Sequence, residues 1–176
     1  MTAVNMRSLF LAPSLALALA AGCAAGGDPD VDEGLAPDDT SVISGDAVIA
    51  IPLAEPHPVV LFLAMVAGPT GQPLPAPAIV NLTVIPAAVL AQGGDGVRTG
   101  PYTFGLVAPA VYVVQGIVDV DENFNALVPA LARPTAADVP GGYVDLATGM
   151  LIPIPVGPNQ VIGEVTVMFA PPPPSG

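Results

Sequence analysis

Basic residues are scarce in this sequence. Fifteen Asp and Glu residues stand against three Arg and no Lys, so the 176-residue chain has a formal net charge of -12. A surface of that sign repels phosphate backbones, which excludes nucleic acid as a partner. Divalent cations and basic partners suit it, and plain solubility is the alternative explanation of the charge.

Long hydrophobic runs are missing after the first 22 residues, although mean hydropathy is +0.70. A membrane-spanning helix needs about 18 or more consecutive apolar residues. The longest later runs, Val59 to Ala67 and Ala108 to Val114, are far shorter and are interrupted or bounded by Pro or Gly. We therefore expect both runs to be strands.

Residues suited to catalysis are also few. After residue 22 the chain has one His, no Lys, one Cys and three Ser, namely Ser41, Ser44 and Ser175. This set leaves little from which to assemble a nucleophile with a base and an orienting acid. One His cannot form a zinc site of the common kinds, and His57, between two prolines, is interpreted as a structural loop residue. We predict that the protein is not an enzyme.

The first 22 residues have the organisation of a bacterial signal peptide. Arg7 supplies a positive n-region, and Leu9 to Ala21 is an apolar run too short for a mature spanning helix. The run ends in Ala20-Ala21-Gly22-Cys23, which resembles the lipobox of bacterial lipoproteins, with Ala20 where Leu is usual. The resemblance implies cleavage before Cys23 and attachment of lipid to its thiol. Either Met1 or Met6 is the start.

Cys23 is the only cysteine, so the fold has no intramolecular disulfide and must rely on packing. Lipidation accounts for a single thiol in an exported protein, and the acyl chains would hold the protein on a membrane. Two alternatives remain, an ordinary secretory leader with Cys23 as a bystander and an uncleaved anchor. Ala24 stands where Asp, by resemblance to enteric lipoproteins, favours inner-membrane retention, so we expect the outer membrane.

Composition divides the remaining chain into three segments. Residues 23–44 carry six acids between Asp28 and Asp39 and almost nothing large and apolar, which predicts a disordered, self-repelling spacer with a reach of roughly 25 Å. Residues 45–170 form the predicted folded domain. Residues 171–176 contain four successive prolines, which cannot pair in a ladder and predict a short polyproline II tail.

The predicted domain is rich in Val and Ile runs separated by Gly, Pro and Asn. Seven short strands with hairpin-sized connections predict an all-β, seven-stranded antiparallel Greek-key sandwich behind a cleaved helical signal peptide. Tyr102, Phe104 and Leu106 alternate with other residues and should share one face. A helical turn is expected only within Pro86 to Gln92 and Ala126 to Arg133. The predicted strands are Asp46 to Ile51, Val59 to Met65, Ile79 to Ile85, Tyr102 to Leu106, Ala110 to Asp119, Leu151 to Val156 and Val161 to Phe169.

Three successive segments of this domain follow a recurring pattern. They are Gly100-Pro101-Tyr102-Thr103-Phe104, Ala108-Pro109-Ala110-Val111-Tyr112-Val113-Val114 and Val118-Asp119-Val120-Asp121-Glu122-Asn123. Together they resemble the GxYxFxxLPPGxYxVxxxxDxDxN stretch of transthyretin-like, carboxypeptidase-regulatory-type modules, with Ala110 in place of the usual turn Gly. The resemblance implies an immunoglobulin-like or transthyretin-like sandwich that is normally non-catalytic.

The last of these segments begins a polar loop. Asp119, Asp121, Asn123 and Asn125 place an oxygen-bearing side chain at every second position directly after a predicted strand. Ca²⁺ takes about six to eight oxygen ligands, and calcium loops supply them at such alternate positions. The spacing therefore predicts a calcium site, and an Asx-rich turn that bonds its own backbone is the alternative.

The loop departs from calcium loops at two positions. Phe124 stands where such loops turn on Gly, and Ala130 stands where a bidentate Glu completes the shell. The missing ligands would come from farther along the chain, with Asp138 and Asp145 as the nearest candidates.

Three functional hypotheses follow. The first is a lipid-anchored, non-enzymatic cell-envelope β-sandwich with a binding or structural role and an unknown protein or glycan partner. The second is a calcium-dependent adhesion or recognition module that uses the Asp119 to Asn125 loop. The third is a small hydrolase with a carboxylate pair drawn from Asp119, Asp121, Glu122, Asp138 and Asp145.

Overall fold

The structure is a computed structural model that describes residues 40–128 and 132–170. The predicted signal peptide, Cys23, nearly all of the predicted spacer and the proline-rich tail lie outside the described residues. Half of the described residues are in the ten strands, and none is in an α-helix. The all-β prediction is therefore confirmed. Among these residues, no helix is long and apolar enough to span a membrane.

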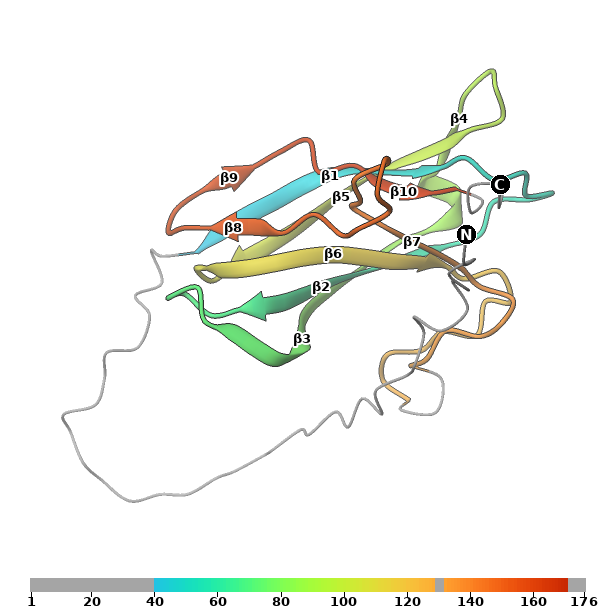
Figure 1. The fold of residues 1–176 in the computed structure, drawn as a ribbon. Helices are drawn as coiled ribbons and strands as arrows, with labels where there is room; N and C mark the ends of the chain where they lie inside the picture. The colour runs from blue at the N-terminus through green and yellow to red at the C-terminus, as the bar shows by residue number, and fades with distance from the viewer. Residues whose placement is uncertain (1–39, 129–131, 171–176) are drawn as a thin grey trace, which may run out of the picture. The chain divides into compact units, whose positions relative to one another are not determined.

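Ten strands and one short 3₁₀ turn follow one another along the described chain (Figure 1). The elements are β1 (Ser41–Ile49), β2 (Val59–Ala67), β3 (Pro73–Ile85), η3 (Ala87–Val89), β4 (Ala91–Gln92), β5 (Arg98–Val107), β6 (Ala110–Val118), β7 (Val139–Gly142), β8 (Ile154–Val156), β9 (Val161–Ile162) and β10 (Val167–Phe169).

All ten strands belong to one sheet with the order β3-β2-β6-β7-β10-β1-β5-β4, in which β8 also pairs with β6 and β9 with β1. Most pairs are antiparallel, but β9 and β10 run parallel to β1. The chain leaves β8, which pairs with β6, and turns into β9, which pairs with β1. The final segment from β9 to β10 therefore starts at the end of the sheet where β1 also starts. The prediction of a wholly antiparallel arrangement is therefore wrong, and the sheet is mixed.

The sheet curls so that β3 approaches β5 (Figure 1). Asn81 on β3 joins the two strands, because its Nδ2 donates to the Gly105 carbonyl at 3.3 Å while its Oδ1 accepts the Leu82 N–H at 2.8 Å. The curl turns one face inward, and large apolar side chains from several strands pack there. Among the fully buried ones are Ile43, Ile49, Leu61, Leu63, Phe104, Val114, Val167 and Phe169.

Burial in β5 alternates only up to a bulge. Tyr102 and Phe104 are both buried and share one face as predicted, but Leu106 is 83% exposed. The register shifts between Ser41 and Ile43 on β1, so that Gly105 and Leu106 together oppose one residue, Val42. A bulge of this kind re-aims a side chain, and the prediction that Leu106 shares the face of Tyr102 and Phe104 is wrong for that reason.

The predicted strand from Val161 to Phe169 is divided into β9 and β10. The chain between them passes close to Gly45, where a Cβ atom would collide with the Val165 backbone. Glu164 has a positive φ of 60°, and the Val165 N–H donates to the Ser44 carbonyl at 3.2 Å. Tyr102 holds the crossing in place, because its hydroxyl donates to the Val165 carbonyl at 2.7 Å.

Other boundaries also differ from those expected. β1 begins at Ser41, before the predicted start of the domain at residue 45, and β7 was not predicted because Pro140, Gly141 and Gly142 are poor strand formers. Pro86 to Gln92 contains η3 and then β4. The other expected helical turn, Ala126 to Arg133, lies partly outside the described residues.

Candidate functional site

The loop between β6 and β7 begins and ends with a buried acid. Val118 pairs with Val139 in the ladder, so Asp119, which follows Val118, and Asp138, which precedes Val139, meet at the base of the loop. Their exposed fractions are only 4% and 8%. The Asp119 N–H donates to the Pro58 carbonyl at 2.9 Å, which ties the base to the start of β2.

Asp121 completes a group of three carboxylates. One oxygen of each of Asp119, Asp121 and Asp138 lies within 4.8 Å of those of the other two. Among the described residues, the one contact within 4.0 Å between a basic and an acidic side chain is that of His57 with Glu122, so no Arg of that part of the chain forms an ion pair with this group. Burial raises the pKa of Asp119, and the charges of Asp138 and Asp121 raise it further, against the hydrogen bonds from Phe124 and Asn123.

Both oxygens of Asp119 bond the loop that follows it. Oδ1 accepts the Asn123 N–H at 3.2 Å and Oδ2 accepts the Phe124 N–H at 3.1 Å. This is the arrangement that the Asx-turn alternative predicts, in which a short polar side chain replaces backbone partners. It lets the chain reverse at Glu122, whose φ is 52°.

Asp138, at the end of the loop that returns to β7, also accepts backbone hydrogen bonds with both oxygens. Its Oδ1 accepts the Val120 N–H at 3.2 Å and its Oδ2 accepts the Thr135 N–H at 2.6 Å. The Thr135 hydroxyl in turn accepts the Ala137 N–H at 3.2 Å. Sequence reasoning missed Thr135, although Thr-x-x-Asp resembles the Ser/Thr-x-x-Glu spacing in which two side chains satisfy each other's backbone donors.

Asp121 is the exposed member of the group and bonds only side chains. Its Oδ2 accepts hydrogen bonds from Asn123 Nδ2 at 2.7 Å and from Thr135 Oγ1 at 2.9 Å. The bond from Thr135 links the outgoing and returning halves of the loop. The predicted ligand Asn123 is therefore part of the site, and Thr135 joins it.

Two of the predicted ligands are used elsewhere. Asn125 Oδ1 accepts the Leu127 N–H at 2.9 Å within its own turn. Asp145 lies between β7 and β8, where its Oδ1 accepts the N–H groups of Ala147 at 2.8 Å and Thr148 at 3.1 Å. Neither residue bonds a member of the carboxylate group in the described residues.

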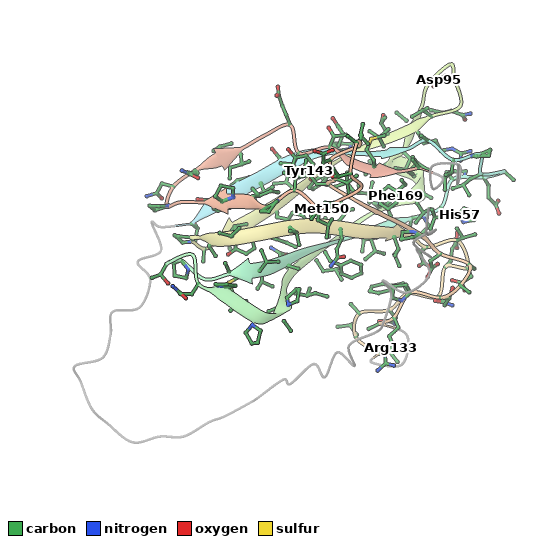
Figure 2. All side chains as sticks on the ribbon, viewed as in Figure 1. His57, Asp95, Arg133, Tyr143, Met150 and Phe169 are labelled. Carbon is green, nitrogen blue, oxygen red and sulfur yellow. The ribbon has the colours of Figure 1, made fainter. Side chains whose placement is uncertain are left out.

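Aromatic and imidazole contacts hold the loop against the sheet. The rings of Phe124 and Phe62 on β2 meet edge to face, with centroids 5.6 Å apart. His57 Nδ1 is 3.7 Å from Glu122 Oε1 and is a buried nitrogen without a hydrogen-bond partner. Figure 2 shows His57 and Arg133 at the same end of the sheet. The loop is thus anchored through Phe124 and lies beside His57.

The geometry supports both chemistries that the sequence predicts for this loop. Every carboxylate of the group already accepts hydrogen bonds, so the Asx-turn alternative accounts for the observed contacts. Carboxylate oxygens keep further lone pairs, however, and three converging acids without a cationic partner suit a hard cation such as Ca²⁺.

Comparison of the chain with protein-family models, with curated proteins and with solved structures found no match.

Proposed function

We propose that this chain is a lipid-anchored, non-enzymatic protein of the bacterial cell envelope, whose β-domain has a binding or structural role toward a protein or glycan partner. The observation that carries the proposal is Cys23, the only cysteine, directly after a signal-like apolar run that ends in Ala20-Ala21-Gly22. Cleavage and acylation there would hold the domain on a membrane, with the outer membrane as the expected location.

For the domain itself we propose a Greek-key sandwich of the immunoglobulin-like or transthyretin-like kind. The curl that brings β3 to β5 supports two facing layers around the apolar core. A second support is the Tyr112 hydroxyl, which donates to the Ala108 carbonyl four residues upstream at 2.7 Å. A tyrosine near a strand start that bonds backbone a few residues upstream resembles the tyrosine corner of Greek-key sandwiches.

The surroundings of the catalytic residue types support a non-enzymatic role. The Ser41 hydroxyl donates to the Gly157 carbonyl at 2.7 Å and accepts the Gln160 N–H at 2.8 Å. His57 lies beside Glu122, at the other end of β1 from Ser41. The one described His and this buried Ser therefore serve separate structural tasks.

Intact-mass spectrometry of the protein extracted from membranes tests the anchor. The expected species begins at Cys23 and carries a lipid-sized mass increment, and a Cys23→Ser variant should lack it and leave the membrane fraction. An unmodified wild-type chain, or one that begins at another residue, would contradict the proposal.

A second candidate function, a calcium-dependent adhesion or recognition module, is favoured by the grouping of Asp119, Asp121 and Asp138. Asn123 and Thr135 would complete the polar surroundings of the ion. Extracellular calcium modules bind with Kd on the order of 10⁻⁴ to 10⁻³ M, so millimolar Ca²⁺ should raise the melting temperature relative to chelator. Identical melting curves under the two conditions would remove this candidate and leave the loop as an Asx turn.

A further inference from the structure

One end of the sheet carries no charged side chain in its turns. We call it the tether end, because β1 begins there at Ser41, and it also holds the turns 68–72, 108–109 and 157–160. A shallow hollow lined by residues of the first and last of these turns shows that they adjoin. Asp, Glu, Lys and Arg are absent from all three turns and from residues 41–45.

Two large apolar side chains protrude from the strands that flank the start of β1. Leu106 on β5 is 83% exposed, and Val161 on β9 is 81% exposed. Val161 pairs with Val42, and the Gly105-Leu106 bulge lies opposite the same residue. The two side chains therefore stand on either side of Val42, on the two strands that flank β1.

Leu106 adopts a backbone conformation that its side chain disfavours. Its φ is 55°, in the left-handed region that Gly, Asn and Asp tolerate better than other residues. With its side chain in solvent, Leu106 gains almost no packing in exchange. A strained backbone under a solvent-exposed apolar side chain points to a role of that side chain on the surface.

Three described acids lie elsewhere, namely Asp46 within β1, Asp145 between β7 and β8, and Glu164 close to Gly45. The other six cluster at the opposite end of the sheet. Asp95 and His57 lie there with Arg133 (Figure 2), as do Asp119 and Asp138 at the base of their loop. In a chain with a net charge of -12, a neutral end is the part that an anionic headgroup layer repels least. Exposed apolar side chains on such an end suit the interfacial layer of a bilayer.

The chain also enters the domain at the tether end. Seventeen residues separate Cys23 from Ser41, and even fully extended they span at most about 60 Å. A lipid on Cys23 would keep the domain at an effective concentration on the order of millimolar near the membrane, so a weak contact suffices to orient it.

We propose that the tether end docks on the lipid bilayer that holds the anchor, with Leu106 and Val161 in the interfacial layer and the Asp119 loop pointing away from the membrane. This inference depends on the lipid anchor proposed above. Docking would present the acidic loop, and any cation it holds, to partners outside the membrane.

Site-directed fluorescence on the full lipidated protein tests the docking. The protein is reconstituted in vesicles of phosphatidylethanolamine and phosphatidylglycerol, with a small thiol-reactive fluorophore on Val161→Cys, or on Asp95→Cys as the control at the opposite end. Lipid consumes the Cys23 thiol, so each variant has one reactive thiol. Nitroxide-bearing lipid should quench the probe at position 161 at least three-fold more than the probe at 95.

A second variant separates docking from misfolding. Leu106→Asn, made in the Val161→Cys background, suits the positive φ and should leave the fold intact while it lowers quenching at 161 toward the level at 95. Equal quenching at 161 and 95, or quenching at 161 that Leu106→Asn does not change, would overturn the docking. Cross-linking between two copies of the unlabelled Val161→Cys variant, with no lipid quenching of the labelled protein, would overturn it in favour of a second copy as the partner.

The same samples separate failure of the docking from failure of the anchor. Suppose that mass spectrometry finds the lipid on Cys23 and that the protein co-floats with the vesicles in a flotation assay. A lack of quenching at position 161 then overturns the docking alone. If Cys23 takes up the fluorophore, the thiol is free and the anchor itself is wrong, and the docking falls with it.

Discussion

At the scale of single residues, the strain at Leu106 has a cost that can be measured apart from membranes. A left-handed conformation costs a residue such as Leu roughly 1 kcal/mol or more relative to Gly, and Leu106 is 83% exposed with a φ of 55°. We expect Leu106→Gly to raise the free energy of unfolding by about 1 kcal/mol and Leu106→Asn to raise it by somewhat less.

Urea unfolding of the full chain measures this gain, with Val161→Asn as the matched control. Val161 is equally exposed but has no positive φ, so its substitution should change stability by less than about 0.5 kcal/mol. Equal effects at the two positions would show that lost surface hydrophobicity, and not backbone strain, is responsible.

The buried hydroxyl of Tyr102 should make the stability of the fold depend on pH in the alkaline range. Burial, with smaller effects from Asp46 and Tyr143, holds the pKa of its hydroxyl well above the usual value. The unfolded chain therefore ionises first, near pH 10, and binds fewer protons than the folded chain there. The stability from this group is complete below about pH 10 and is lost as the pH rises above it.

Tyr102→Phe should separate the hydrogen bond from the titration. At neutral pH the variant loses the bond to the Val165 carbonyl, which we expect to cost about 1 kcal/mol. Above pH 10 its stability should fall less steeply than that of the wild type, as followed by urea unfolding at each pH. Tyr112, whose pKa burial also raises, accounts for part of the remaining slope. Parallel curves would contradict the assignment.

At the scale of elements, the sequence predicts strands well and their partners poorly. Runs of Val and Ile predict β2 and β6 correctly, because each of these two strands is buried on both faces. The last run, Val161 to Phe169, alternates as one strand should, yet it divides where it crosses Gly45. That contact lies between residues more than a hundred positions apart, so no local pattern records it.

The candidate site shows the same limit. The Asp119 to Asn123 spacing identifies the outgoing half of the loop, and Asp138, a more distant candidate ligand, lies close to Asp119 and Asp121. Asp145 is a candidate ligand on the same grounds, but it lies in its own turn. The two acids differ because the pairing of Val118 with Val139 brings Asp138 to the loop. The sequence Pro140-Gly141-Gly142 does not predict a strand, so this pairing could not be predicted.

Packing between β7 and β10 explains why β7 contains glycine. A Cβ on Gly141 would collide with the Phe169 ring and with the Met168 carbonyl. Because Phe169 is fully buried, neither it nor the backbone can move freely. Gly141→Ala should therefore destabilise the fold by about 2 kcal/mol or more.

Gly105→Ala is the control for this substitution, since a Cβ at Gly105 meets nothing within 4 Å. We expect its effect on the urea midpoint to be within about 0.5 kcal/mol of zero. If Gly141→Ala were equally neutral, β7 would not pack on Phe169 as described.

At the scale of the whole molecule, a calcium response must be distinguished from general screening of the net charge of -12. Any salt relieves self-repulsion, whereas a site of Kd about 1 mM adds roughly 1.4 kcal/mol of stability at 10 mM Ca²⁺ by mass action. Asp121→Asn and Asp95→Asn each remove one negative charge, but only Asp121 belongs to the carboxylate group. Asp95 instead accepts the Val97 N–H in an exposed turn.

In urea unfolding with Ca²⁺ against NaCl of equal ionic strength, the wild type and Asp95→Asn should therefore gain the extra stability and Asp121→Asn should not. Both substitutions weaken self-repulsion by the same unit of charge, so a difference between them isolates the loop. An equal gain in all three proteins would assign the whole effect to screening, and the Asp119 loop would then serve the fold only through its hydrogen bonds to Asn123, Phe124, Val120 and Thr135.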